Sequence, residues 1–240
     1  MSIITSASRD PFGVAMWDYM KGNHHAVVKV WSDIAIDDEI PVRYLFRTRS
    51  QMPEWEQLAL DECRGKVLDV GAGAGSHTLA LQHDGLEVDA LDISPGAVEM
   101  MKTRGVTSPV HQSIWEVPEA EYDTLLMMMN GIGLVGDLKG LNRFLEEADK
   151  WLAPGGQILM DSSDIAYLFE DNPEKLQAKN QPYYGIIHYQ MSFGKATGAP
   201  FNWLYIDFPR LEKHARVFGY TAEKLAEGPH YEYLARLTKD

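Results

Sequence analysis

The chain has 240 residues, 45% of them hydrophobic, enough to bury one sizeable core and typical of one α/β domain with additions. Its 35 acidic and 22 basic residues give a formal net charge of −13, which disfavours nucleic acid and anionic membranes as partners. A single cysteine excludes an internal disulfide framework, and the absence of a secretory pattern or a membrane-spanning stretch leads us to expect a cytoplasmic protein.

The first 64 residues are predicted to form an N-terminal helical cap. Proline in the first turn marks the start of one helix over 11–22 and of another over 53–65. An extended stretch over 37–50 lies between them and carries Tyr44 and Arg47. We interpret this region as a cover for the domain that follows.

From residue 66 the sequence alternates apolar runs with helical patterns, which indicates a parallel sheet with crossover helices. A helix from Leu138 to Leu152 has apolar residues at steps of three and four, and Pro154 and two glycines are expected to end it. Ser94 and Pro95 predict a helix start directly after the second strand. The first five predicted strands span 66–70, 86–91, 106–110, 122–129 and 157–160.

After residue 164 the pattern becomes more aromatic and typical of β-structure. Runs over 185–193 and 201–207 flank a turn region and predict an inserted β-hairpin. A helix over 209–218 and two last strands, 221–226 and 231–237, complete the chain. We expect a single domain over 1–240, with the cap over 1–64, a cofactor-binding core over 65–164, and the hairpin and the end of the sheet over 165–240.

A glycine-rich turn follows the first predicted strand of the core. Gly71, Gly73 and Gly75 precede Ser76, at a position where a dinucleotide fingerprint would have a further glycine. Asp69 stands two residues before the first glycine, where its carboxylate would repel a pyrophosphate but attract the ammonium of an amino-acid moiety. The turn therefore favours a cofactor that carries an amino acid.

Four blocks resemble, in order and spacing, those of the class I S-adenosylmethionine-dependent methyltransferases. They are VLDVGAGAGSHTLAL, LDISPGAVEMM, YDTLLMMMNGIG and LAPGGQILMDSSD, and they cover residues 65–164. The resemblance implies a doubly wound, Rossmann-like α/β sheet of seven strands in the order 3-2-1-4-5-7-6, with the last strand antiparallel. It also implies S-adenosylmethionine as cofactor and S-adenosylhomocysteine as product.

The resemblance further implies which residues bind the cofactor. The methionine end would lie against the turn after the first strand, the ribose diol against the carboxylate that ends the second, and the adenine beside it. The end of the fourth strand would complete the site. In that order the candidates are Asp69, Gly71, Ala72, Gly73 and Gly75; Asp92; Ile93, Ser113 and Ile114; and Met129 and Asn130.

Candidates for the acceptor side and for catalysis rest on residue type alone. Aromatic and cationic residues near the substrate would be Tyr44, Arg47, Tyr184 and Trp203, and catalytic candidates are His188, Asn130 and Arg47. For His188 we favour a structural role over that of a general base. We expect no metal, although Asn130, Asp161 and Asp164 at neighbouring strand ends would be the oxygen ligands of such a site.

The function that we expect is methyl transfer to a small-molecule oxygen or nitrogen, by a monomer or homodimer. The residues after the fourth strand lack the N/D-P-P-Y/F motif of enzymes that methylate base amines, and Cys63 precedes the first strand, which excludes a C5-methylase nucleophile. A protein or RNA methyltransferase, a non-catalytic S-adenosylmethionine-binding protein and a dinucleotide-binding protein are the alternatives.

Overall fold

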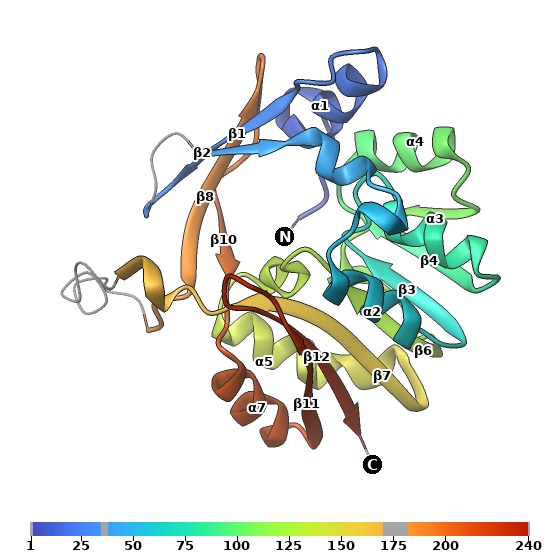
Figure 1. Ribbon diagram of the computed structural model, residues 1–240, viewed down its shortest axis with the longest axis vertical. Coiled ribbons are helices and arrows are strands. Elements are labelled where there is room, and N and C mark those ends of the chain that lie inside the picture. The colour runs from blue at the N-terminus through green and yellow to red at the C-terminus, as the bar shows by residue number, and fades with distance from the viewer. Residues whose placement is uncertain (1, 35–37, 170–181, 240) are drawn as a thin grey trace.

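The computed structural model describes residues 2–34, 38–169 and 182–239, which form two β-sheets and surrounding helices (Figure 1). The larger sheet has seven strands. In chain order they are β3 (Lys66–Val70), β4 (Glu87–Asp92), β5 (Ser108–His111), β6 (Tyr122–Met127), β7 (Leu152–Ser163), β11 (Tyr220–Glu227) and β12 (Glu232–Lys239). Its central strands are buried and apolar, because helices cover both faces.

The strands of the larger sheet lie in the order β11-β12-β7-β6-β3-β4-β5. Strands β3 to β7 are parallel to one another, and β12 is antiparallel to β7. This confirms the doubly wound, Rossmann-like fold and its predicted strand order. The winding reverses at β3, which has β4 on one side and β6 on the other, so the carboxyl ends of these strands form the crevice where such sheets bind ligands.

Alternate residues of each central strand face different helices. Val67 belongs to the buried cluster that includes residues of α2 (Glu54–Glu62) and α3 (Ser76–His83), whereas Leu68 belongs to the one that includes residues of α5 (Leu138–Glu147) and α7 (Phe208–Val217). Helix α4 (Pro95–Arg104) covers β4 on the same face as α3. The predicted helix before the fifth strand ends earlier than expected, because β7 already begins at Leu152.

The smaller sheet is built from strands that precede the larger sheet in the chain and strands that are inserted after β7. Its strands are β1 (Val27–Ser32), β2 (Asp38–Pro41), β8 (Ile186–Phe193), β9 (Ala196–Thr197) and β10 (Phe201–Leu204). Antiparallel pairing gives the order β10-β8-β1-β2, with β9 beside β8. The predicted hairpin is present as β8 and β10. It pairs with β1, so the first 64 residues contribute two strands to a sheet in addition to the helices that we expected there.

The stretch expected to be extended from residue 37 is only partly so. Its first residue lies outside the described ranges, β2 accounts for four residues, and the 3-10 turns η2 (Val42–Phe46) and η3 (Arg49–Gln51) follow. Strand β1 is absent from the sequence-based prediction, and of its two pairing partners one, β8, is more than 150 residues away in the chain. Within the described ranges, no helix combines the length and the apolar character that crossing a membrane requires.

A single buried carboxylate anchors the smaller sheet to the larger one through α1 (Pro11–Met20). Asp10 Oδ1 accepts the N–H of Gly13 at 2.9 Å, and its Oδ2 accepts the Ser94 hydroxyl at 2.7 Å and the N–H of Gly96 at 3.0 Å. Asp10 therefore caps the N-termini of both α1 and α4. A Cβ on Gly13 would lie 2.8 Å from Gly96 Cα, so the two helices cross almost backbone to backbone.

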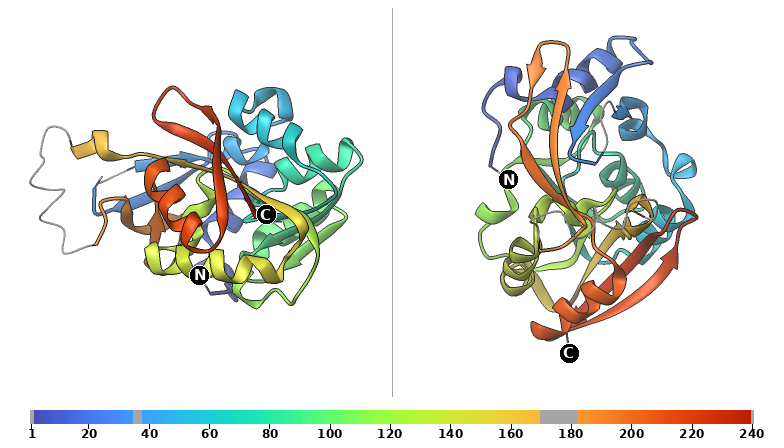
Figure 2. Two further views of the ribbon diagram at one scale, coloured as in Figure 1. Left: turned by 90° about the horizontal axis from the view of Figure 1, so that it is seen from below. Right: turned by 90° about the vertical axis from the view of Figure 1, so that its left-hand side faces the viewer.

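The crossing of α1 and α4 fixes where the smaller sheet stands. Two further views show that sheet standing beside the larger one (Figure 2). The smaller sheet thereby closes one side of the space above the carboxyl ends of β3, β4 and β6.

Candidate functional site

The turn after β3 exposes bare backbone at the carboxyl edge of the sheet. Gly71 and Gly73 have φ values of +79° and +58°, a left-handed conformation that side chains disfavour. A Cβ built on Gly71 would meet no atom within 4 Å, and one on Gly73 would meet only Leu45 Cδ2, at 3.8 Å. The backbone here faces open space, in which a ligand fits.

Gly75 has a different role from the other two glycines of this turn. It precedes α3 with φ +78°, and a Cβ there would lie 2.8 Å from Val106 Cγ2 and 3.1 Å from Met101 Cγ. It does not line the cavity described below. Its placement indicates that Gly75 serves the packing of α3 and, unlike the other predicted glycines, does not face the cavity.

Asp92, at the end of β4, holds the glycine turn in place. Its Oδ2 accepts the N–H of Gly73 at 2.9 Å and its Oδ1 the N–H of Ser94 at 2.8 Å. Loss of hydration raises the pKa of Asp92 to about 6, although these hydrogen bonds act in the opposite direction. The group is ionised at neutral pH, and each oxygen keeps a lone pair for a ligand hydroxyl.

Asp69 lies at the base of the same space. It is 2% exposed, and its Oδ2 accepts the hydroxyl of Thr78 at 2.6 Å. Burial raises the pKa of Asp69, against the opposing effects of the positive charge of His77 and the hydrogen bonds of Thr78. The other oxygen has no hydrogen bond within the described residues and can accept one from a ligand ammonium.

A buried ionic network lies next to Asp69. Nη2 of Arg47 is 2.8 Å from both carboxylate oxygens of Glu56, and Oε2 of Glu56 is 3.0 Å from Nε2 of His77. Burial alone would raise the pKa of Glu56, but His77 and Arg47 hold it below its usual value. Burial alone would lower the pKa of His77, but Glu56 and Asp69 hold it above.

This network changes the interpretation of Arg47. Its side chain is 14% exposed, and its Nε also donates to the carbonyl oxygen of Tyr44 at 2.9 Å. The residue lines the cavity as expected, but its charge is already paired with Glu56. Its place near the substrate stays a prediction, but the pairing leaves Arg47 without a free charge for an anionic group.

The end of β6 is held in a strained conformation. Met129 and Asn130 both have left-handed backbones, with φ values of 64° and 55°, which is costly for methionine. The carboxylate of Asp161 accepts the N–H of Asn130 at 2.8 Å, and burial raises the pKa of Asp161 to about 7. Asp164 instead accepts the hydroxyl of Tyr184 at 2.7 Å.

The three residues that could have formed a metal site at the strand ends, Asn130, Asp161 and Asp164, have other partners. The carboxylates of Asp161 and Asp164 serve backbone and tyrosine donors, and the side-chain oxygen of Asn130 accepts the Ser163 hydroxyl at 3.2 Å. In the described ranges, no group of three or more histidine, cysteine, aspartate or glutamate residues could hold a metal ion.

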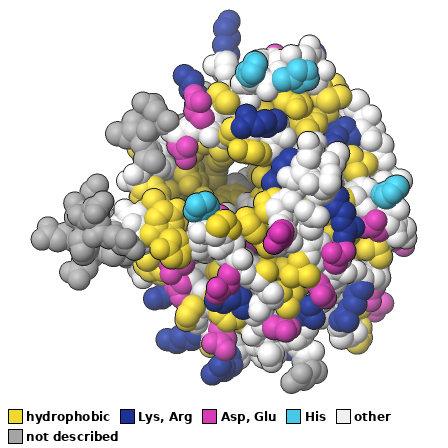
Figure 3. Space-filling model, viewed as in Figure 1, with side chains coloured by type: hydrophobic (Ala, Val, Ile, Leu, Met, Phe, Trp, Pro, Cys, Tyr) yellow, Lys and Arg dark blue, Asp and Glu magenta, His cyan; other side chains and the backbone are white. Residues whose placement is uncertain are grey.

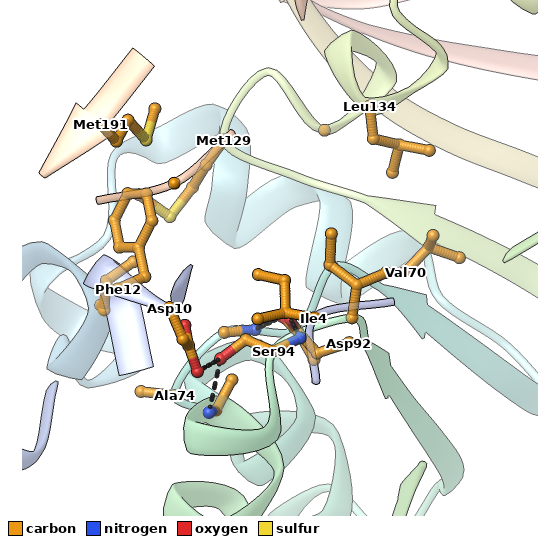
Figure 4. A pocket seen from close by; sticks show the side chains of 18 of the residues that line it. Ile4, Asp10, Phe12, Val70, Ala74, Asp92, Ser94, Met129, Leu134 and Met191 are labelled. Carbon is orange, nitrogen blue, oxygen red and sulfur yellow. Dashed lines mark hydrogen bonds between the residues drawn. The ribbon is translucent and has the colours of Figure 1, made fainter. Parts of the chain in front are cut away.

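A cavity of about 960 Å³ runs from the glycine turn to the smaller sheet. Its mouth appears as a hollow lined by hydrophobic side chains, with acidic ones at its edge (Figure 3). In the close view, Phe12, Met129 and Met191 gather on one side, and Val70 and Asp92 lie across from them (Figure 4). The cavity therefore joins both sheets.

The lining divides into two parts. The cofactor half comprises the lining residues of the loops after β3, β4, β5 and β6 and of the N-terminal segment, and it contains ten of the predicted cofactor residues. These are Asp69, Gly71, Ala72, Gly73, Asp92, Ile93, Ser113, Ile114, Met129 and Asn130. The acceptor half comprises the lining residues of the smaller sheet, the turn η2, Leu134 and Tyr205.

The predicted substrate and catalytic residues are only partly brought together. Tyr44 and Trp203 line the acceptor half, whereas Tyr184 does not line the cavity and binds Asp164 instead. His188 is exposed, because Ile187 and Tyr189 occupy the inner face of β8. His188 and Tyr184 therefore do not face the cavity, and the structural role that we favour for His188 agrees with its place on the outer face of β8.

Several lining residues were missed by sequence reasoning. Phe12 comes from α1, and Ile4 comes from the N-terminal segment that precedes it. The N–H of Ile4 donates to the carbonyl oxygen of Ile93 at 3.0 Å, which joins this segment to the core. His77 carried a local signal, since it follows the glycine turn by two residues, but its buried partner Glu56 lies on another helix. Asp10 has a cap signal, while its bond to Ser94 spans 84 residues.

Comparisons with known proteins agree with this geometry. A family model described as a methyltransferase domain matches residues 67–156. A crystal structure of an S-adenosylmethionine-dependent methyltransferase from Bacteroides fragilis, in complex with S-adenosylhomocysteine, is 45% identical, with a TM-score of 0.91. That match covers 99% of this chain and 98% of the other.

More distant relatives share parts of the chain or its fold. The demethylmenaquinone methyltransferase of Tropheryma whipplei is 28% identical over 100 residues, which are 40% of each chain. The 1,6-didemethyltoxoflavin-N1-methyltransferase of Burkholderia thailandensis is 16% identical, with a TM-score of 0.54 over 99% of this chain and 94% of the other. The latter likeness concerns the fold alone.

The strand order, the reversed last strand and the glycine turn define the Rossmann-like methyltransferase fold. The 45% identity over nearly the whole of both chains goes further than the fold. The chain belongs to the S-adenosylmethionine-dependent methyltransferases, enzymes of class EC 2.1.1.

Proposed function

We propose that the enzyme methylates an oxygen or nitrogen of a small molecule that binds in the acceptor half. The observation that carries this proposal is the continuity of one cavity from the glycine turn to the aromatic face of the smaller sheet. A pocket of this size suits a drug-sized molecule. A net charge of −13 argues against a nucleic-acid substrate, and the Burkholderia relative acts, by its name, on a small molecule.

The cofactor half suits S-adenosylmethionine in its shape and its donors and acceptors. The carboxylate of Asp92 would take the ribose diol, and that of Asp69 the ammonium of the methionine moiety. The adenine would lie between apolar side chains of Ile93 and Ile114, and the bare backbone at Gly71 would leave room for the methionine chain. These assignments follow the charge and shape of the wall.

The cofactor supplies a methyl group on a sulfonium, which is transferred in line to the acceptor atom. The carbon–sulfur bond breaks with its electron pair on sulfur, the new bond forms to oxygen or nitrogen, and an acceptor proton passes to water. The protein positions the two partners and excludes solvent through apolar lining residues such as Met129 and Leu134. Its residues do not need to form a covalent intermediate.

A calorimetric titration tests the cofactor assignment directly. The purified protein should bind S-adenosylhomocysteine with a Kd on the order of micromolar and should not bind NAD in a parallel titration. Acceptor candidates are then screened with S-adenosylmethionine labelled on its methyl group. Binding of NAD alone, or of neither compound, would refute the proposed function.

Gly133→Ala is expected to damage the acceptor half and spare the cofactor half. A Cβ at Gly133 would overlap the indole ring of Trp203, so the ring must move. Turnover of the first acceptor found should fall at least ~10-fold, while S-adenosylhomocysteine affinity stays within about twofold. Trp203→Ala is the matched variant, and the double variant should lose no more than the worse single one, because both changes act through the same ring. Additive losses would contradict this reading.

A further inference from the structure

The inner face of the smaller sheet forms an apolar wall without a free charge in its interior. Val30, Ile40, Met191, Phe201 and Trp203 contribute to this face of the acceptor half. Antiparallel pairing places these side chains on one face of the sheet. Val30 lies opposite Met191. On the other side of β8, Phe201 lies opposite Tyr189 and Trp203 opposite Ile187.

The charges of the acceptor half are either paired or at the rim. The guanidinium of Arg47 is held by Glu56, so it has no free charge to offer. Asp38 is exposed, and its Oδ1 already accepts the N–H of Glu39 at 2.8 Å. Arg9 also lines the cavity, but it is exposed and belongs to η1 (Ala7–Arg9) of the N-terminal segment. A carboxylate or phosphate buried against the wall itself would therefore lose its hydration without gaining a cation, which is strongly unfavourable.

Three aromatic rings continue along this wall. The ring centroids of Tyr189 and Phe201 are 6.0 Å apart, and those of Phe201 and Trp203 are 6.1 Å apart. The ring planes within these pairs are inclined by 52° and 74°, so the three rings offer both faces and edges, with little conformational freedom to lose. A flat aromatic compound, which packs edge-to-face as well as stacked, fits such a surface better than a flexible chain does.

The hydroxyls of Tyr189 and Tyr205 provide the polar contact of this wall. Their oxygens lie 3.0 Å apart, and both residues line the cavity. Burial, together with nearby negative charge, raises the pKa of both phenols, so both are protonated at neutral pH. One hydroxyl donates to the other, which leaves the second proton without an acceptor within the described part of the chain.

We propose that the methyl acceptor is a flat, uncharged aromatic compound whose hydroxyl or carbonyl oxygen accepts a hydrogen bond from the Tyr189–Tyr205 pair. The inference rests on the proposed function, because it takes this half of the cavity as the acceptor site. The pair offers one O–H donor on a wall that is otherwise apolar. A ligand without an acceptor for this O–H would leave the donor unpaired on binding and would therefore bind more weakly. The Tyr189–Tyr205 pair thus orients the acceptor.

Three naphthalenes of equal shape test the proposal by calorimetry on the protein saturated with S-adenosylhomocysteine. They are 2-naphthol, 2-naphthoate and naphthalen-2-ylmethylammonium, and they differ in the group that meets the tyrosine pair. We expect 2-naphthol to bind at least ~10-fold more tightly than either charged compound. Tighter binding of the ammonium would assign recognition to Asp38, and tighter binding of the naphthoate would require a free cation; either result overturns the proposal.

Tyrosine variants test the hydrogen bond itself. The double variant Tyr189→Phe and Tyr205→Phe should bind 2-naphthol about fivefold more weakly or worse, since the donor is lost and the rings remain. Tyr184→Phe, a neighbouring tyrosine outside the cavity, is the matched control and should leave the affinity unchanged. An unchanged affinity in the double variant refutes the proposal.

The same titrations distinguish a failure of the proposed methyltransferase function from a failure of the proposed acceptor class. Failure to bind S-adenosylhomocysteine counts against the proposed function as a whole. Normal binding of S-adenosylhomocysteine with no binding of 2-naphthol leaves that function standing and overturns only the acceptor class.

Discussion

Replacement of Asp92 by alanine is expected to weaken S-adenosylhomocysteine binding at least ~100-fold. The change removes both carboxylate oxygens that would take the ribose diol, and each hydrogen bond to a charged group is worth about 1.5–3 kcal/mol. It also frees the N–H of Gly73, which Asp92 holds at 2.9 Å, so the glycine turn loses its anchor. Titration calorimetry measures the loss.

Asp89→Asn is the matched control for this variant. Asp89 lies on the same strand and accepts the hydroxyl of Tyr122 at 2.8 Å, but it does not line the cavity. Its replacement should leave S-adenosylhomocysteine affinity within about twofold, because no ligand contact is removed. A comparable loss in both variants would show that the effect of Asp92→Ala comes from general damage to β4.

The pH dependence of binding gives a second readout of the same carboxylate. Burial raises the pKa of Asp92 to about 6, so the ionised form that binds the diol is lost as the pH falls through this value. Affinity should then drop by about tenfold per pH unit, at most, below pH 6. The free energy of unfolding changes in the opposite direction. Because the folded protein binds this proton more tightly than the unfolded chain does, protonation of Asp92 contributes stability as the pH falls below about 6. Affinity that is flat from pH 7 to 5 would contradict the role of Asp92.

The fold of the core was predictable because its signals are local. Buried parallel strands appear as continuous apolar runs, and Ser94 with Pro95, or Gly71 with Gly73, mark the turns between strand and helix. The cofactor half follows from the same local order, since its residues are the first ones after strands. For this reason all but one of the residues proposed for the cofactor line the cavity.

The acceptor half was less predictable because it depends on long-range pairing. Lys29 lies opposite Ser192, a contact that no local pattern specifies. A side chain on a strand also changes face with each residue, so His188 points away from the cavity although Tyr189 lines it. Charge pairing is not specified by the local pattern either: Arg47 and Glu56 are nine residues apart, but their pairing depends on how the turn η2 and helix α2 pack together.

Replacement of Glu56 by alanine is expected to lower the free energy of unfolding by about 3–5 kcal/mol, because it leaves buried charged partners without their carboxylate. The side chains of Glu56 and His77 are 5% and 8% exposed, and that of Arg47 is 14% exposed. Urea denaturation measures the change. Glu99→Ala is the control, since its pair with Lys102 is exposed and should be worth less than about 1 kcal/mol.

The loss caused by Glu56→Ala should be greatest at mildly acidic pH. The pKa of Glu56 is held below its usual value of 4.5, so its contribution is present above that value and is lost as the pH falls further. The pKa of His77 is held above 6.5, so its contribution is present below 6.5 and is lost as the pH rises through the folded-state value. The difference between wild type and variant should therefore peak between pH 4.5 and 6.5. A difference independent of pH would exclude an ionic origin.

The same variant also tests the proposal that the acceptor half disfavours anions because Arg47 is paired. Without Glu56, the guanidinium of Arg47 keeps its place in the cavity wall but no longer has a buried counter-charge. Such a group pairs readily with a carboxylate, so 2-naphthoate should bind Glu56→Ala more tightly than it binds the wild type, by about tenfold. Glu56→Gln, which removes the charge but keeps the shape, should show the same gain. If neither variant gains affinity for 2-naphthoate, the pairing of Arg47 with Glu56 does not account for weak binding of anions in the acceptor half.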